Sequence, residues 1–317
     1  MEKRHPIIKR ILENIDEVMI GKRNVAELSL IAMLAEGHVL LEDVPGVGKT
    51  MMVRALATSI NASFKRIQFT PDLLPSDVTG TSIYNQKEQE FVFRPGPIMG
   101  HIILADEINR TSPKTQAALL EGMEEASVTV DGVTRKLEQP FLVMATQNPI
   151  EYEGTYPLPE AQLDRFLLKM KMGYPDATEE LEVLSRAQHQ QPIEDLQQVI
   201  SVEDVRLLQQ QVKQVYVDQT IKQYIVAIAN GTRAHRSVYL GVSPRGSIAL
   251  MKASQAYAFI QGRDYVIPDD VQFLAPFVLV HRVMLKPEEK YGGEEPEAII
   301  SELLASIPVP VQGLIEK

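Results

Sequence analysis

The chain has 317 residues, of which 23% are charged and 44% hydrophobic. This length suggests two domains, and the composition excludes a disordered or fibrous protein. The formal net charge is −10, which disfavours binding to nucleic acid unless basic residues gather on one face. The sequence contains no cysteine, which excludes disulfides and thiolate metal sites and agrees with a reducing compartment.

Neither a local metal site nor a membrane segment is evident. The longest apolar stretches fall short of the ~18 residues that a spanning helix needs. The segment Met1–Lys9 is charged and lacks the apolar core of a signal peptide, so we expect a cytoplasmic protein. The histidines lie too far apart in sequence to form a local ligand pair, and we interpret each as structural: His5, His38, His101, His189, His235 and His281.

The first half of the chain alternates helical and strand-like segments. Leu28–Glu36 reads as an apolar helix, and after Gly37 the short apolar run His38–Glu42 is typical of a buried parallel strand. Similar runs predict four further strands at Phe64–Phe69, His101–Ala105, Phe141–Ala145 and Phe166–Met170. Buried strands joined by helices predict an α/β fold with a five-stranded parallel sheet covered on both faces.

Two insertions interrupt this alternation. Ser82–Phe93 carries alternating apolar residues around a polar centre, which predicts a hairpin. Val128–Thr134 predicts a second hairpin, because Asp131-Gly132 supplies the positive φ values of a tight turn. On the pattern alone, a decorative and a functional role are equally supported.

After Lys171 the pattern becomes helical, which predicts a boundary near residue 174. We expect an α/β core with two inserted hairpins over residues 1–174 and an all-helical lid over residues 175–317. Asp218 and Ser243 are placed as helix N-caps, with Pro244 at a first helical position. The predicted helices are Thr178–Gln190, Ser201–Val215, Asp218–His235, Ser243–Gln261, Pro268–Val283 and Glu295–Ala305.

A glycine-rich loop, Asp43-Val-Pro-Gly-Val-Gly-Lys-Thr50, lies between a predicted strand and a helix that opens at about Met51. This is the context of a phosphate-binding loop, in which glycines let backbone N–H groups surround phosphate oxygens at a helix N-terminus. Lys49 would neutralise phosphate charge, and the hydroxyl of Thr50 would hold Mg²⁺. The residues assigned to the nucleotide here are Pro45, Gly46, Val47, Gly48, Lys49, Thr50 and Met51.

A pair of carboxylates, Asp106 and Glu107, follows the predicted strand His101–Ala105. A buried strand that ends in an acid directs it at the ligand crevice of an α/β sheet. Asp106 would accept from the metal's water shell, and Glu107 would orient and polarise an attacking water. An acidic pair after a strand is common, so the hypothesis depends on its combination with the phosphate loop.

Three further polar residues are candidates for the same chemistry. Asn148, at the end of the next strand, could bind the γ-phosphate or the water, or could simply be a turn residue before proline. Arg165 could reach the nucleotide of a neighbouring subunit, or form a salt bridge to Asp164 or Glu160. Arg245, at the second position of a capped helix, could touch the γ-phosphate from the lid, or be an ordinary surface arginine.

Together these segments resemble the MoxR family of AAA+ ATPases. The resemblance extends from the turn at Ile20-Gly21 to the helix start Tyr265–Val271. The motifs that carry it are Asp43–Thr50, Leu104–Gln116, Glu121–Glu125, Ala145–Pro149 and Pro157–Phe166. Asp43 departs from the pattern, since it replaces the leading glycine of the loop; its side chain should point away from the phosphates.

The resemblance implies a fold, cofactors, partners and roles. It implies a P-loop AAA+ core and lid, ATP with Mg²⁺, and an adenine pocket that includes Ile20 and Gly21. It implies that Asn148 and Arg245 are the two sensors and that Arg165 acts on the next subunit of a ring, usually a hexamer. The two hairpins would face a central pore and push on a client protein. Family members often work as chaperone-like remodellers beside a protein with a von Willebrand factor A domain.

Two other functions remain open. The protein could be a scaffold that assembles on ATP and hydrolyses it slowly. It could also be a nucleic-acid motor, although the net charge and the few basic residues near the hairpins, Lys87, Arg135 and Lys136, argue against this.

Overall fold

The structure is a computed structural model that describes residues 4–42, 44, 46–148, 154–187 and 192–310. The chain divides into two compact units. One is Pro6–Gln209, and the other combines Met1–His5 with Gln210–Lys317. Each unit is described by itself.

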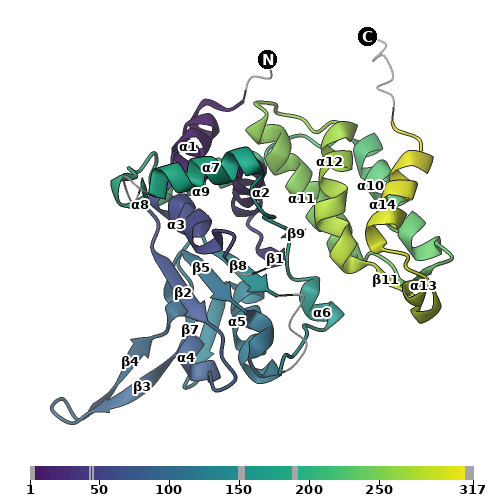
Figure 1. Ribbon diagram of the computed structural model, residues 1–317. Helices are drawn as coiled ribbons and strands as arrows, with labels where there is room; N and C mark the ends of the chain where they lie inside the picture. Colours follow the sequence, from purple (N-terminus) through teal and green to yellow (C-terminus); the bar gives the residue numbers. More distant parts are fainter. Residues whose placement is uncertain (1–3, 43, 45, 149–153, 188–191, 311–317) are drawn as a thin grey trace. The chain divides into compact units, whose positions relative to one another are not determined.

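The first unit is built on a five-stranded sheet in which all pairs are parallel, as the sequence predicts. The strand order is β2-β5-β8-β1-β9, so β2 and β9 are the edge strands (Figure 1). The register places Gln68 beside Asp106 and Glu42 beside Gln147, which brings the carboxyl ends of four strands to one edge. The strands are β1 (Val39–Glu42), β2 (Phe64–Gln68), β5 (Ile102–Asp106), β8 (Leu142–Gln147) and β9 (Leu168–Met170).

Helices cover both faces of the sheet. On one face lie α1 (Pro6–Asp16), α2 (Arg23–Leu34) and α3 (Lys49–Ser59). On the other face α4 (Pro75–Thr79) and α5 (Pro113–Glu125) pack, together with short 3₁₀ turns at Pro97–Met99 (η1) and Ile108–Arg110 (η2). Nearly all of α2 is buried, which explains why most of its residues are apolar; Glu27 and Ser29 are the buried polar exceptions.

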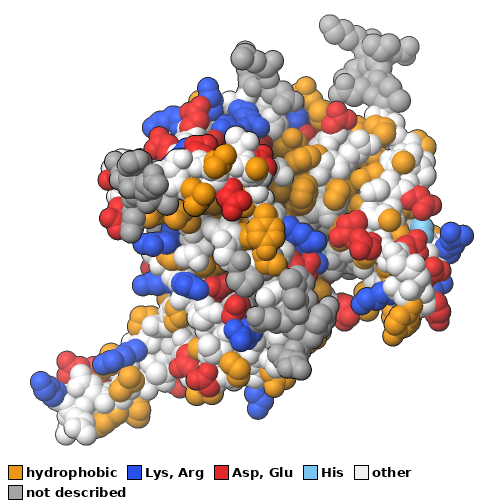
Figure 2. Space-filling view, viewed as in Figure 1, with side chains coloured by type: hydrophobic (Ala, Val, Ile, Leu, Met, Phe, Trp, Pro, Cys, Tyr) orange, Lys and Arg blue, Asp and Glu red, His pale blue; other side chains and the backbone are white. Residues whose placement is uncertain are grey.

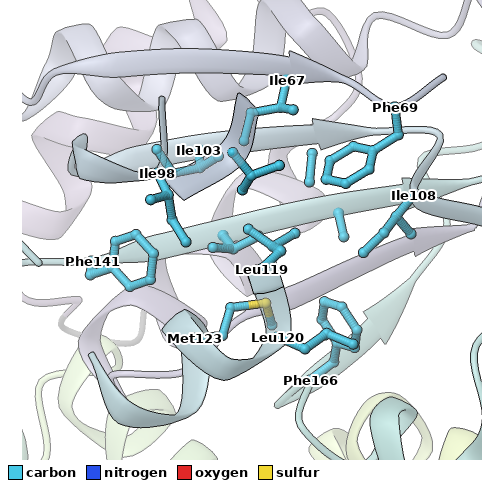
Figure 3. Close-up of a cluster of buried hydrophobic side chains, with 14 of the residues drawn as sticks. Ile67, Phe69, Ile98, Ile103, Ile108, Leu119, Leu120, Met123, Phe141 and Phe166 are labelled. Atoms are coloured by element: carbon cyan, nitrogen blue, oxygen red, sulfur yellow. The ribbon is translucent and has the colours of Figure 1, made fainter. Parts of the chain in front are cut away.

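A buried core lies between α5 and the sheet, and it takes side chains from one face of β5. Leu119, Leu120 and Met123 of α5 lie in one buried cluster with Ile103 of β5, and Leu120 lies beside Phe166 (Figure 3). Successive side chains of a strand face opposite sides of the sheet, so the next residues along β5 pack under α3 instead. The fully apolar sequence of β5 follows from burial on both faces.

Both insertions form the predicted antiparallel hairpins. The first pairs β3 (Gly80–Asn85) with β4 (Glu90–Pro95), and it extends away from the sheet (Figure 1). The second pairs β6 (Ser127–Val130) with β7 (Val133–Lys136). Its turn has φ of 52° at Asp131 and 75° at Gly132, the left-handed values expected of this dipeptide. The guanidinium of Arg135 lies 3.8 Å from the centroid of the Phe93 ring, so the two hairpins touch.

The chain between β9 and the second unit is helical but packs on the first unit. The backbone N–H of Val199 donates to the carbonyl of Ser59 at 2.8 Å, and Gln209 Nε2 donates to the carbonyl of Met33 at 2.7 Å. The division into compact units therefore falls at Gln209, whereas the sequence places the boundary near 174. The helices concerned are α7 (Ala177–Ala187), α8 (Pro192–Asp195) and α9 (Val202–Val212), whereas the short helix α6 (Glu160–Leu163) precedes β9. The last residues of the helix predicted over Thr178–Gln190 lie outside the described residues.

The second unit is helical apart from one short element that the sequence pattern misses. Strands β10 (Val238–Leu240) and β11 (Met284–Leu285) form an antiparallel pair with a bulge, so the prediction of an all-helical lid is wrong in this detail. The pair is too short for a period-two pattern to reveal it. The helices are α10 (Gln219–Ala234), α11 (Pro244–Ile260), α12 (Pro268–Leu279), α13 (Pro287–Tyr291) and α14 (Pro296–Ser306), with a 3₁₀ turn at Val280–Arg282 (η3).

Helix caps in this unit follow the sequence. Asp218 accepts a hydrogen bond from the N–H of Thr220 at 2.8 Å, and the hydroxyl of Ser243 accepts one from Gly246 at 3.3 Å. At the start of α12, Asp270 is almost fully buried and forms a two-pronged pair with Arg263. This pairing raises the pKa of Arg263. Among the described residues no helix is both long and apolar enough to cross a membrane.

We expect Leu119→Ala to destabilise the protein by about 2–5 kcal/mol, because it removes a fully buried side chain from the core beneath α5 and leaves a cavity. The matched control is Leu207→Ala, at a position that is 56% exposed, which should change stability by less than about 0.5 kcal/mol. Urea unfolding followed by circular dichroism measures both. Equal effects of the two substitutions would contradict this account of the core.

Candidate active site

A pocket of about 480 Å³ opens at the carboxyl edge of the sheet, within the first unit. Its residues come from the loop after β1, from α3, and from the ends of β2, β5 and β8, with one contribution from α8. This is the place where parallel α/β sheets hold ligands. It is lined by Gly46, Gly48, Lys49, Thr50, Met51, Arg54, Arg66, Gln68, Asp106, Glu107, Thr146, Asn148 and Ile193.

The glycine-rich loop contributes most of one wall. Gly46 and Gly48 have φ of 87° and 91°, a left-handed conformation that other residues rarely adopt. Helix α3 begins at Lys49 and its cap position, Gly48, has no capping side chain, so the first N–H groups of α3 face the pocket mouth as anion donors. Lys49 Nζ donates to the carbonyl of Val44 at 3.2 Å. Val47 is also predicted to contact the nucleotide, but its side chain is buried and it is not among the residues that line the pocket.

Of the remaining residues predicted for this loop, two line the pocket and two lie outside the described residues. Thr50 and Met51 line the pocket as predicted. Pro45 and Asp43 lie outside the described residues, so the expectation that the Asp43 carboxylate points away stays a prediction.

The acidic pair is held by polar partners from neighbouring strands. Asp106 Oδ2 lies 2.6 Å from Arg66 Nη2, and Asp106 Oδ1 accepts from the Thr146 hydroxyl at 2.7 Å. Glu107 Oε2 accepts from Gln68 Nε2 and from Arg110 Nη1, both at 2.9 Å. Since both oxygens of Asp106 and one of Glu107 have donors, the pocket neutralises much of its own negative charge.

The backbone at Glu107 is strained. Its φ of 59° and ψ of 48° are left-handed, a conformation that costs a residue with a side chain on the order of 1 kcal/mol or more. This kink lets two consecutive residues both face the pocket at the end of β5, although successive strand residues otherwise alternate. Strain of this kind persists where surrounding contacts fix it, and it concentrates at functional sites.

Asn148 lines the pocket just beyond β8 and is 8% exposed. Side chains hold the ends of the neighbouring strands together at this point. Gln147 Nε2 donates to Glu42 Oε1 at 2.8 Å, and Lys169 Nζ lies 2.8 Å from Glu42 Oε2. Because Glu42 immediately precedes the glycine-rich loop and Gln147 immediately precedes Asn148, these contacts fix the two segments against each other.

Neither of the two arginines predicted to contact the nucleotide, Arg165 and Arg245, is among the described residues that line this pocket. Arg165 Nε lies 3.0 Å from Glu124 Oε2 of α5. Arg245 belongs to the second unit, where it is exposed at the second position of α11. Their roles stay predictions.

The turn at Ile20 and Gly21 lies between α1 and α2 and is not among the pocket's described lining residues. Gly21 has φ of 68°, and the carboxylate of Glu179 in α7 lies against its Cα, so that a Cβ there would be 1.8 Å from an oxygen of that carboxylate. The neighbouring Met19 side chain approaches Gly48 of the phosphate loop. The turn is therefore close to the loop, and its predicted role in adenine binding stays a prediction.

Sequence reasoning missed four polar lining residues: Arg54, Arg66, Gln68 and Thr146. Two of them, Arg66 and Gln68, alternate with the buried Ile67 on the edge strand β2. Polar residues of the same parity on a strand share a face, and this alternation is the signal that could have identified them. With Lys49, the two arginines bring three cationic side chains to one pocket.

The donor set suits a phosphate ester with a hard metal ion. The hydroxyl of Thr50 and the carboxylate of Asp106 are oxygen ligands of the kind Mg²⁺ prefers. In the described part of the chain no group of three or more acidic or histidine residues could hold a metal by itself. Mg²⁺ is commonly bound through one or two protein oxygens together with substrate phosphates, so the residues present fit this ion with a nucleotide.

Known proteins share this architecture. The sequence matches the ATPase family associated with various cellular activities (AAA) over residues 38–168 and the AAA lid domain over residues 230–303. A crystal structure from Cytophaga hutchinsonii, described as that of a candidate ATPase, superposes with a TM-score of 0.91 at 40% identity, covering 96% of this chain and 95% of the other.

Sequence relatives cover almost the whole chain. Uncharacterized protein YeaC of Bacillus subtilis is 68% identical over 98% of this chain and 97% of its own. Chaperone MoxR1 of Mycobacterium tuberculosis is 41% identical over 96% of this chain and 82% of its own. Protein MoxR of Paracoccus denitrificans is 30% identical over 92% of this chain and 93% of its own. With the pocket, the five-stranded parallel sheet and the lid, these matches establish that the chain belongs to the MoxR family of AAA+ ATPases.

Proposed function

We propose that this protein binds ATP with Mg²⁺ in the pocket at the sheet edge and hydrolyses it to ADP and phosphate. The observation that supports this most is the convergence, in one pocket, of the left-handed glycine loop, Lys49, and the pair Asp106 and Glu107. The loop N–H groups and Lys49 bind the phosphates, and Thr50 and Asp106 hold Mg²⁺. When bound, Mg²⁺ neutralises the charge that develops on the transferred phosphoryl group.

Glu107 is proposed as the group that orients the attacking water and accepts its proton. Its carboxylate lies at the pocket wall within reach of Gln68 and Arg110. Asn148, held beside the loop by the contacts of Glu42, donates to the γ-phosphate or to the same water. Ile20 and Gly21 form part of the adenine pocket in this proposal, and their position beside the phosphate loop agrees with that role.

We extend the proposal to assembly. Arg165 acts on the ATP of the next subunit in a ring, for which a hexamer is the expected form, and Arg245 of the lid contacts the γ-phosphate of its own chain. Loss of the γ-phosphate would remove contacts on both sides of the subunit interface, and this would couple hydrolysis to movement.

The proposed work of such a ring is remodelling of a client protein in the cytoplasm, together with a partner that carries a von Willebrand factor A domain. The β3–β4 hairpin supports a protein client, because it exposes large apolar side chains among its polar ones (Figure 2). Phe91 is 72% exposed, and Ile83, Tyr84 and Val92 are also exposed. Exposed apolar groups at this density mark interaction sites. Arg135 of the second hairpin stacks on Phe93, so this cation already has a partner within the protein. The name of the relative MoxR1, a chaperone, agrees with this function.

A scaffold with slow turnover is the second candidate. The hydrogen bonds that Gln68 and Arg110 donate to Glu107 favour it, because both donors engage the same carboxylate oxygen and leave that atom less available to a water molecule. Turnover measurements separate the two candidates.

Lys49→Ala should weaken ATP binding about 10- to 100-fold, because it removes a charged donor to the phosphates. Fluorescence anisotropy with a labelled ATP analogue measures the affinity. The matched control Lys9→Ala removes an exposed lysine of α1 and should bind as tightly as the unaltered protein. Unchanged affinity of Lys49→Ala would remove the basis of the proposed function.

Glu107→Gln should retain ATP binding and lose turnover by about 10²- to 10⁴-fold, because an amide cannot accept the proton of water. Phosphate release is followed at several protein concentrations. A ring-forming motor shows turnover per subunit that rises with concentration and is abolished by the substitution. Little turnover in either form would favour the scaffold.

A mixing experiment tests the proposed action of Arg165 on a neighbouring subunit. Arg165→Ala alone should lower turnover by about 10³-fold, while the control Arg206→Ala, at an exposed position of α9, should not. Mixed rings of Arg165→Ala and Glu107→Gln chains should recover turnover, because some interfaces then combine an intact Glu107 with an intact Arg165. Absence of recovery in mixed rings would place the arginine's action within its own chain.

A further inference from the structure

Thr146 occupies a central position between the two carboxylates of the pocket. It lies near the end of β8, is 1% exposed, and is one of the lining residues. Its hydroxyl donates to Asp106 Oδ1 at 2.7 Å and accepts from the backbone N–H of Glu107 at 2.8 Å. One oxygen atom therefore contacts both members of the acidic pair.

The direction of each hydrogen bond is fixed by chemistry. A backbone N–H can only donate, so the Thr146 oxygen must accept from Glu107. The hydroxyl has a single proton, and the ionised carboxylate of Asp106 can only accept, so that proton is directed to Asp106. Among side chains of this size, a hydroxyl, that of threonine or serine, offers a donor and a strong acceptor at the same atom.

The bond to Asp106 fixes the orientation of the proposed metal ligand. Asp106 Oδ2 is engaged by Arg66, whose side chain is 47% exposed. The bond from Thr146 is better shielded, since Thr146 is 1% exposed and the Asp106 side chain 14%. Shielded hydrogen bonds to charged groups are the more costly to break. Thr146 therefore sets the plane of the carboxylate even when the exposed arginine moves.

The bond from Glu107 stabilises the left-handed backbone. With φ of 59° and ψ of 48°, Glu107 caps the 3₁₀ turn Ile108–Arg110. A strained conformation persists only where neighbouring contacts outweigh its cost, and the Thr146 hydroxyl supplies one such contact at the strained residue itself. Thr146 and Asn148 have the same parity on β8, so both reach the pocket from the same side of the strand.

We propose that Thr146 is a positioning residue for ATP hydrolysis, whose hydroxyl holds Asp106 in place for the metal and Glu107 in the conformation that faces the attacking water. This inference rests on the proposed function. It differs from a purely structural role, in which the hydroxyl only satisfies buried groups and its loss lowers stability without a specific effect on turnover.

Two substitutions separate the hydroxyl from the rest of the side chain. Thr146→Val keeps the shape and removes the hydroxyl, whereas Thr146→Ser keeps the hydroxyl and removes the methyl group. Thr115→Val is the matched control: Thr115 is fully buried in the same unit, outside the pocket, and its hydroxyl donates to the carbonyl of Leu73 at 2.8 Å. Each variant is first checked for folding by thermal unfolding without nucleotide.

Steady-state turnover and nucleotide affinity give the first readout. Thr146→Val should lower kcat about 10- to 100-fold, the effect of one to two hydrogen bonds to charged groups. ATP affinity measured in EDTA should stay within about twofold, and the gain in affinity on adding Mg²⁺ should shrink. Thr146→Ser should retain kcat within about threefold, and Thr115→Val should leave kcat unchanged while lowering the unfolding temperature.

Hydrogen exchange of the Glu107 amide in the nucleotide-free protein gives a readout independent of activity. Thr146→Val should accelerate its exchange about tenfold or more, and Thr146→Ser should not. If the unaltered protein hydrolyses no ATP, the proposed function fails, while this readout still reports whether Thr146 holds Glu107.

Three results would overturn the inference. They are an equal loss of kcat in Thr146→Val and Thr146→Ser, unchanged kcat in Thr146→Val, and a loss of kcat in Thr115→Val as large as that in Thr146→Val. If Thr146→Val does not fold, Thr146→Ala replaces it in the comparison with Thr146→Ser. Retained turnover in the serine variant and lost turnover in the alanine variant then support the inference, and equal turnover of the two overturns it.

Discussion

The parallel hydrogen bonding of β5 with its two neighbours is the constraint on which the site depends. It sets β2 and β8 on either side of β5 in a fixed register, with Gln68 beside Asp106 and Ala105 beside Ala145. The end of β5 is therefore flanked on one side by the polar side chains of β2 and on the other by Thr146 and Asn148. A shift of β8 by one residue would turn Thr146 away from the acidic pair, since successive strand residues face opposite sides.

Much of this arrangement follows from sequence patterns that are local. The five strands, the two hairpins and the caps at Asp218 and Ser243 agree with the structure because apolar runs, the Asp-Gly turn and N-cap residues each act within a few positions. The glycine loop and the acidic pair converge on one pocket for the same reason: each is fixed by the strand that precedes it.

What the sequence did not reveal depends on tertiary packing. The helices from α7 to α9 have the pattern of a lid, yet hydrogen bonds such as that from Gln209 to Met33 place them on the first unit. Arg66 and Gln68 look like ordinary surface residues until the strand order shows that β2 lies at the edge, beside β5. Thr146 is likewise unremarkable in sequence, because its role comes from two residues of another strand about 40 positions away.

The contacts of Asp106 differ in what it would cost to break them if the proposed Mg²⁺ bound there. The proposed Mg²⁺ would compete with Arg66 for this carboxylate. Because Arg66 is half exposed, its ion pair contributes on the order of 1 kcal/mol. The bond from Thr146 is better shielded, because Thr146 is 1% exposed, and breaking it would leave a largely shielded carboxylate oxygen without its donor, at a cost of about 1–3 kcal/mol. The cheaper change is for the arginine to leave. The guanidinium of Arg66 thus occupies Asp106 at a place that the proposed metal would take, while Thr146 of β8 would keep the carboxylate in position.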